Sequence, residues 1–184
     1  MIKLANPAPL GLFGFAVTTW MLCMFNVKWW GIETFPLMCS TAFVFGGTAQ
    51  FVAGLMEYPR GNTFGTVAFC SYGCFWFAFA LYLMAFGGKG PLNYLGAWLV
   101  IWAVFTFVLW IATLKAGGRA LQLVFLTLWV AFLLLGLSHL LPKDIGDVLH
   151  TTGGYVGLLC AALAFYLASA QVLNEVYEKP LLPV

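Results

Sequence analysis

Residues 7–27 read PAPLGLFGFAVTTWMLCMFNV and contain no charged residue. A run of about 20 apolar residues is long enough to cross the hydrocarbon core of a bilayer as an α-helix. Five further apolar blocks follow at residues 34–56, 63–86, 92–114, 120–141 and 151–173, separated by short segments rich in glycine, proline or charge. These blocks are too long, and alternate too little, for the strands of a membrane barrel. The sequence therefore predicts an all-α integral membrane protein with six transmembrane helices.

The composition agrees with a membrane protein and excludes several other classes. Of the 184 residues, 63% are hydrophobic, 18% are aromatic and only 8% are charged, whereas a soluble domain is about 45–50% apolar and about 25% charged. Too few charges remain for the surface of a soluble enzyme, a disordered tail or a nucleic-acid-binding protein. Six spans of about 20 residues leave roughly 64 residues for loops and ends. Residues 1–184 are therefore expected to form a single transmembrane channel or transporter domain.

The distribution of basic residues predicts the orientation in the membrane. Five Lys or Arg residues flank the spans on the side of the two chain ends, and three lie on the other side. The five are Lys3, Arg60, Lys115, Arg119 and Lys179, and the three are Lys28, Lys89 and Lys143. Because cytoplasmic loops carry an excess of positive charge, both termini are expected in the cytoplasm.

The 14 charged residues, 8 basic and 6 acidic, all fall in loops, in tails or within one turn of a helix end. An ionisable residue inside a span would indicate a proton relay or a fixed ion site, so the absence argues against a carboxylate-driven pump or a voltage sensor. A pathway would have to be lined by neutral polar groups, aromatic side chains and helix dipoles. The five cysteines lie in apolar blocks without a set of further ligands, so no metal and no cofactor are expected.

Three odd-numbered spans begin on the side of the chain ends with features of helix N-termini. Asn6 introduces Pro7 and Pro9 in the first span, Asn62 precedes the third span, and the fifth begins near Arg119. Each helix N-terminus carries a partial positive charge and free N–H groups. If the odd-numbered helices surround a central pathway, the three ends would attract an anion there. The alternative is that each is an ordinary cap that faces lipid headgroups.

Three side chains are expected at one depth in these odd-numbered helices. Phe15, Tyr72 and Leu128 each lie nine residues beyond Asn6, Thr63 and Arg119, respectively. At about 1.5 Å per residue this is roughly 13 Å into each helix, near the middle of a core about 30 Å thick. The three could form a narrow, mostly apolar ring in which the Tyr72 hydroxyl would donate one hydrogen bond to a passing ion. Ordinary core packing is the alternative.

Neutral polar residues lie on both sides of that depth. Gln50 is expected in the cytoplasmic half, Ser71 adjoins the ring, and Thr18 and Thr19 lie one turn beyond Phe15. Amides and hydroxyls can replace part of the hydration shell of a carboxylate. The alternative for Gln50 is bonding between helices, and for the hydroxyls it is bonding to the carbonyl three or four residues back.

Two histidines lie near the outer ends of the fifth and sixth spans. His139 and His150, with Asp144 and Asp147, could suggest a metal site or a pH-dependent gate. Their spacing matches no metal motif. We expect solvated residues of an outer loop covering residues 142–150.

Ordered motifs along the chain resemble those of the acetate uptake transporter family, which comprises the bacterial succinate–acetate permeases and their fungal relatives. The motifs include N6-P-A-P-L-G-L12, G46-G-T-A-Q50, G54-L-M-E-Y58, G61-N-T-F-G65 and S71-Y-G-C-F-W76. The resemblance implies a six-helix protomer in a homohexamer, with one pathway through each protomer. It also implies that Phe15, Tyr72 and Leu128 form the hydrophobic constriction. The residues that match the first motif are Asn6, Pro7, Pro9 and Gly11, and Gln50 matches a polar residue of the second helix.

The residues and the resemblance together predict a permease for acetate, other small monocarboxylates and, in some members, succinate, in the bacterial inner membrane. A passive anion channel is favoured, because no buried titratable residue is expected. A proton-coupled acetate symporter and a channel for a small neutral solute such as urea are the alternatives. No enzymatic activity is predicted, because no nucleophile–base pair or metal cluster falls within a span.

Overall fold

The computed structural model describes residues 4–116 and 118–184, so Lys3, which contributed to the predicted charge bias, lies outside the described residues. The α-helices are α1 (Ala8–Asn26), α2 (Phe35–Thr41), α3 (Gln50–Glu57), α4 (Thr63–Phe86), α5 (Leu92–Ala116), α6 (Arg119–Ser138) and α7 (Lys143–Val176). In the described residues, 6 helical segments are long and apolar enough to cross a membrane. The six-helix prediction is therefore confirmed.

The second span is a composite of several helical segments. It runs over Ile32–Arg60 and joins α2 to α3 through a π-helical stretch, Ala42–Ala49. A π-helix is wider than an α-helix and is rare outside single turns in functional regions. In this stretch, a Cβ on Gly47 would lie 2.6 Å from the ring of Phe77 in α4. The sequence predicted an ordinary helix here, because the apolar pattern does not distinguish an α-helix from a π-helix.

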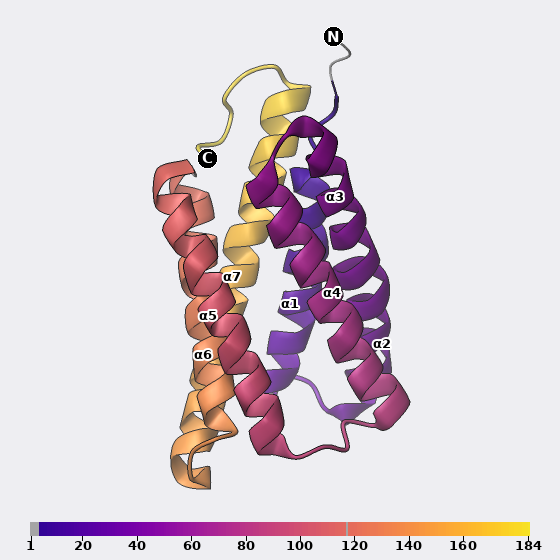
Figure 1. Cartoon of the computed structure of the whole chain (residues 1–184), viewed down its shortest axis with the longest axis vertical. Coiled ribbons are helices and arrows are strands. Elements are labelled where there is room, and N and C mark those ends of the chain that lie inside the picture. Colours follow the sequence, from indigo (N-terminus) through magenta and orange to yellow (C-terminus); the bar gives the residue numbers. More distant parts are fainter. Residues whose placement is uncertain (1–3, 117) are drawn as a thin grey trace.

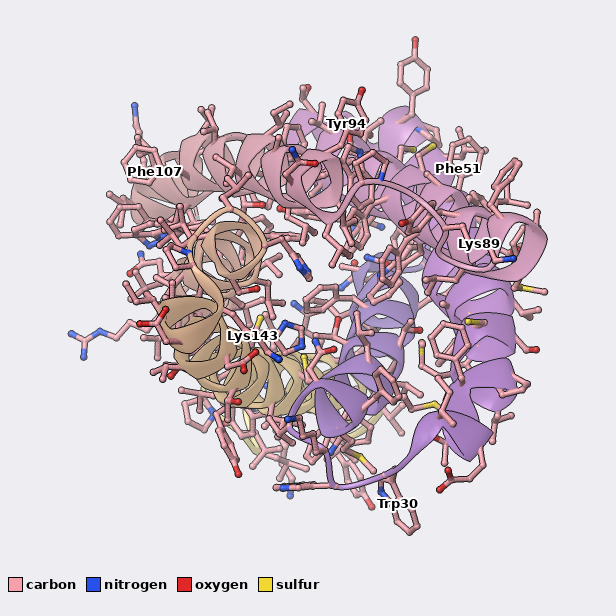
Figure 2. The ribbon with its side chains drawn as sticks, turned by 90° about the horizontal axis from the view of Figure 1, so that it is seen from below. Trp30, Phe51, Lys89, Tyr94, Phe107 and Lys143 are labelled. Carbon is pink, nitrogen blue, oxygen red and sulfur yellow. The ribbon has the colours of Figure 1, made fainter. Side chains whose placement is uncertain are left out.

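The helices run side by side, and both chain ends lie at the same end of the molecule (Figure 1). We call this the termini end; the opposite end carries the loops after α1, α4 and α6. Figure 2 looks along the helices from the opposite end, near Trp30, Lys89 and Lys143. Helices α1, α4, α5, α6 and α7 surround the centre, and α2 and α3 pack outside α1 and α4. The common end for both termini agrees with the prediction, and its cytoplasmic location stays a prediction.

Helix α7 packs closely on α1 and α6 through glycines. A Cβ on Gly157 would collide with Cys23 Sγ of α1, and a Cβ on Gly153 would lie 3.0 Å from Leu135 Cγ of α6. Small residues let helix backbones approach one another in membranes, where the hydrophobic effect does not drive association. These contacts fix α7 between two helices that line the centre.

Helix α7 also corrects the predicted outer loop. Residues 143–150 are helical, and α7 starts at Lys143 directly after Pro142. Pro142 has an extended backbone, its carbonyl accepts a hydrogen bond from the Gly146 N–H at 2.8 Å, and Asp144 lies in the first turn. An acidic residue in the first turn stabilises a helix start. The charged residues and the glycine that predict a loop here therefore form the first two turns of a long helix.

The outer faces of the helices are apolar. On α5, the side chains of Ile101, Val104 and Val108 are 60–67% exposed. Such a continuous exposed apolar face is unstable in water and stable against lipid tails.

Candidate functional site

A cavity of about 310 Å³ opens between the helices in the half of the molecule near the termini end. Its apolar walls come from α1, α4 and α6. Polar side chains of α3, α7 and the helix starts complete it. The polar residues that line it are Asn6, Gln50, Glu57, Arg60, Asn62 and Gln171. This cavity is rich in amide and charged groups.

A second cavity, of about 90 Å³, occupies the other half. Aromatic and aliphatic side chains of α1, α4, α5 and α6 form most of its walls. Phe75 is central to them, since its ring stacks on Trp98 with centroids 4.8 Å apart and meets Phe132 edge-on at 5.2 Å. The polar residues that line it are Thr19, Asn26, His139 and His150. The second cavity is thus the smaller and more apolar of the two.

Phe15, Tyr72 and Leu128 line both cavities. They come from α1, α4 and α6, and each is no more than 5% exposed. The rings of Phe15 and Tyr72 have centroids 6.3 Å apart and are tilted by 45°. The three residues that the sequence predicts at one depth, nine residues from each predicted helix start, therefore lie where the two cavities meet.

The hydroxyl of Tyr72 points away from the role that the sequence suggested for it. Its oxygen lies 2.9 Å from Thr106 Oγ1 of α5, and Thr106 Oγ1 donates to the Trp102 carbonyl at 2.7 Å. A threonine hydroxyl has one proton. Because Thr106 uses that proton on Trp102, Tyr72 must be the donor in its bond with Thr106. The expectation that Tyr72 donates to a passing ion is wrong for this arrangement.

The first cavity contains an ion pair that the sequence reading missed. Glu57, at the end of α3, is 1% exposed, and its Oε2 lies 3.4 Å from Arg60 Nε. Asn62 Nδ2 donates to the same Glu57 oxygen at 3.0 Å, while Glu57 Oε1 is buried without a hydrogen-bond partner among the described residues. The expectation of uncharged walls is therefore wrong. The sequence places Glu57 at a helix end, where a charged side chain usually faces water. The E57-Y-P-R60 turn instead directs the Glu57 carboxylate inward.

Two of the three predicted helix N-termini reach the first cavity. Asn62 caps α4 by accepting the Gly65 N–H at 3.0 Å. Asn6 accepts the Ala8 N–H at 3.2 Å, although the residue in the N-cap position of α1 is Pro7. Helix α6 begins at Arg119 without a side-chain cap, and it lines the cavity only from Leu121 onward.

Three residues of the first motif, Pro7, Pro9 and Gly11, support α1 and do not line either cavity. Pro7, Pro9 and Gly11 are buried. A Cβ on Gly11 would lie 2.5 Å from the ring of Phe69, so the glycine allows α1 to approach α4. These three residues therefore support the cavity wall without being part of it.

The amides of Gln50 and Gln171 both line the first cavity. Gln50 is 1% exposed, and neither side-chain oxygen has a hydrogen-bond partner among the described residues. The alternative of bonding between helices is thus not seen for the Gln50 oxygen. Gln171 was missed, although an amide within an apolar block is the same signal that drew attention to Gln50.

The threonine and serine residues predicted to line the pathway lie in three different environments. Thr19 lines the second cavity, whereas Thr18 is fully buried beside Gly46 and Ser71 lies outside both cavities. The hydroxyls of Thr18 and Thr19 have no hydrogen-bond partner in the described part of the chain, so they do not bond to the preceding turn.

Comparison with known proteins identifies the family. The family model described as GPR1/FUN34/yaaH matches residues 1–179. The chain belongs to the GPR1/FUN34/yaaH family. It is 42% identical to the succinate-acetate/proton symporter SatP of Escherichia coli K12, over 99% of this chain and 96% of the relative. Acetate permease A of Emericella nidulans is 37% identical, over 99% of this chain and 66% of the relative.

A solved structure described as the bacterial acetate channel SatP has the same fold. It matches with a TM-score of 0.92 and 40% identity, and the match covers 99% of both chains. The GPR1/FUN34/yaaH relatives named here are transporters or channels. The resemblance carried by the sequence motifs is confirmed.

In this member of the GPR1/FUN34/yaaH family, the two histidines lie at the far end of the second cavity. His139 follows α6, His150 lies on α7, and their ring centroids are 5.7 Å apart. Burial lowers the pKa of His139. The predicted loop position is wrong for His150, because it lies on α7, whose first turns bring it back over the end of α6; both histidines are partly buried.

Proposed function

We propose that this protein is a permease for acetate and other small carboxylates in the bacterial inner membrane, and that it works as a passive anion channel. The family relatives named for acetate transport support the substrate class. The observation that carries the pathway is that Phe15, Tyr72 and Leu128 line both cavities. These three side chains are proposed to form the hydrophobic constriction between two wet vestibules.

Solvation of the anion sets the mechanism. A carboxylic acid with a pKa of about 4.3 is neutral in roughly 1 molecule in 500 at pH 7. The anion is thus the abundant species, and its bare insertion into a low-dielectric medium costs tens of kcal/mol on a Born estimate. A useful pathway must keep the anion solvated except over a short distance.

The first cavity supplies groups for that solvation. Asn6, Asn62, Gln50 and Gln171 can present side-chain N–H groups, since amides rotate to suit a ligand. The Arg60 cation lies at the same wall but is paired with Glu57, so it does not act as an isolated charge. Several weak sites suit conduction better than one tight site.

The constriction is proposed to select among the ions that enter. The three apolar surfaces force the passing anion to lose nearly all of its water. This favours acetate, because its methyl end binds little water and only its one carboxylate must be dehydrated. A larger or doubly charged acid loses more hydration at the same place, and inorganic ions gain nothing from the apolar wall. Acetate is therefore the preferred substrate, with succinate as a poorer one.

Reconstitution tests this function directly. Purified protein in liposomes should give a current that depends on an acetate gradient, without an imposed pH gradient. Leu128→Ala should widen the constriction and raise that current. An absence of current, with acetate entry strictly tied to a pH gradient, would overturn the channel. Uptake of labelled urea in place of acetate would instead favour a channel for neutral solutes.

Proton-coupled symport is the second candidate, and one observation favours it. Glu57 is a titratable group buried in the wall of the first cavity. A carrier that moves a proton with acetate can use such a group as its proton site. Glu57→Gln should abolish acetate accumulation driven by a pH gradient if the protein is a symporter. It should leave acetate-dependent current in place if the protein is a channel.

The proposed assembly is a homohexamer with both termini in the cytoplasm, and each six-helix protomer, residues 1–184, is one transport domain. The exposed apolar faces leave room for contacts with neighbouring copies as well as lipid. Native mass spectrometry in detergent should give six chains per particle. Protease access to the termini in inverted vesicles tests the orientation.

A further inference from the structure

The two histidines are the chain's only imidazoles, and they meet although ten residues separate them. Their rings are arranged edge to face, with an interplanar angle of 69°, at the mouth of the second cavity away from the constriction. The other polar groups of that cavity are Thr19 and Asn26. The rest of the wall is apolar, so the histidines dominate the chemistry of this mouth.

The hydrogen bonds of Ser138 assign the proton of neutral His150. Ser138 Oγ donates to the Leu135 carbonyl at 2.7 Å and lies 3.4 Å from His150 Nδ1. Because the serine has one proton, Nδ1 of His150 must be the donor in the contact with Ser138. Nε2 is then the free acceptor of the neutral ring. Protonation at Nε2 converts that acceptor into a charged donor.

The charges around the pair come from a few elements. Lys28 lies just after α1, and Asp147 lies one turn before His150 on α7. Helix α5 packs against His139, since a Cβ on Gly96 would lie 2.9 Å from His139 Cβ, and its one charged residue is Lys115 at the far end. Asp147 is the acidic residue nearest to His150 in sequence, and the positive charge of a protonated pair faces a mostly apolar cavity.

We propose that His139 and His150 form a binding subsite for small carboxylates at the mouth opposite the termini end, and that this subsite binds the anion when its imidazoles are protonated. The inference rests on the proposed function, since the ligand is the permeating anion. Two imidazolium N–H groups match the two oxygens of one carboxylate. The subsite would concentrate acetate at this mouth of the pathway, ahead of the constriction, from an acidic exterior, where histidine is charged.

The test is the pH dependence of current across a planar bilayer or a one-sided patch, with the acetate anion held at a fixed concentration. Neutral acetic acid carries no current, so its leak does not contribute. Burial lowers the pKa of His139 below the ordinary imidazole value of about 6.5, so its protonated fraction rises at a lower pH, by at most about tenfold for each pH unit. Stepwise acidification on the histidine side, from pH 7.5 downward, should raise the native current by up to about tenfold for each pH unit, and acidification on the other side should not.

The variant His139→Gln/His150→Gln should carry current with a flat pH profile, whereas the neighbouring Asn26→Ala should keep the rise. Diethylpyrocarbonate, applied to the native protein, should flatten the profile by modifying these two imidazoles, which makes the test independent of folding of the variant. A full rise in the double variant or after diethylpyrocarbonate would overturn the subsite. An absence of native acetate current at every pH would instead overturn the proposed function.

Discussion

Replacing Tyr72 by Phe separates two roles for the residue at the meeting point of the cavities. The phenol ring borders both cavities, whereas its hydroxyl proton is donated to Thr106. Tyr72→Phe keeps the ring and removes only the hydroxyl. We expect the acetate current to change by less than about twofold, since a phenyl ring presents nearly the same apolar wall.

The magnitudes make this expectation discriminating. If the hydroxyl donated to the dehydrated anion, its removal would forfeit a hydrogen bond to a charged group, about 1.5–3 kcal/mol. At about 1.4 kcal/mol per factor of ten, the current would fall by roughly 10- to 150-fold. The bond to Thr106 is instead a neutral one inside a membrane protein, so its loss should lower the free energy of unfolding by about 0.6–1.5 kcal/mol.

The assay combines acetate-dependent current in liposomes with unfolding in detergent, on the same preparations. Thr106→Val is the matched control, because it removes the same bond from the other side and leaves the Tyr72 proton free. That variant should be destabilised more than Tyr72→Phe, since it leaves a buried donor without a partner. A tenfold loss of current in Tyr72→Phe with unchanged stability would refute the assignment of the proton to Thr106.

Three further changes test other parts of the structure. Phe15→Ala should raise acetate flux and admit larger acids in a competition assay, and unchanged selectivity would place the constriction elsewhere. Gly157→Leu should lower the unfolding free energy by about 1–3 kcal/mol, because the new side chain overpacks against Cys23, and equal thermal stability would contradict that contact. Asn62→Ala should cost about 0.5–2 kcal/mol through loss of the α4 cap, which circular dichroism during heating measures.

Much of the fold and the central ring could be predicted from the sequence, because both depend on quantities that are local. The length of each apolar block sets the number of spans, and the rise per residue sets the depth of a side chain in a straight helix. Phe15, Tyr72 and Leu128 meet because their helices start at one end and pass the same distance. Asn62 could be identified as a cap for the same reason, since a cap acts on its own helix.

The parts that sequence could not supply depend on how segments meet in space. Glu57 follows an apolar helix as any solvated end residue would, and only the position of Asn62 and Arg60 makes it a buried, paired carboxylate. His150 was read as part of a loop, because its neighbours are charged and include a glycine. The close packing of Gly146 against the Ser138 carbonyl allows that segment to continue as helix and to face His139.

The two cavities differ in a way that bears on direction. At the termini end, the cation of Arg60 is neutralised by Glu57, and amides provide hydrogen bonds whose strength does not change with pH. At the opposite end, the wall is apolar and the polar groups include two imidazoles whose charge depends on pH. A constant, weak site on one side and a proton-dependent site on the other would make entry from an acidic solution on the histidine side faster than entry from the termini end. A passive pore cannot change the equilibrium distribution, so acid on the histidine side would change conductance and leave the reversal potential at the value set by the acetate gradient. A shift of that reversal potential with the pH gradient would mean that protons cross with acetate, and Glu57 would then be the first residue to test.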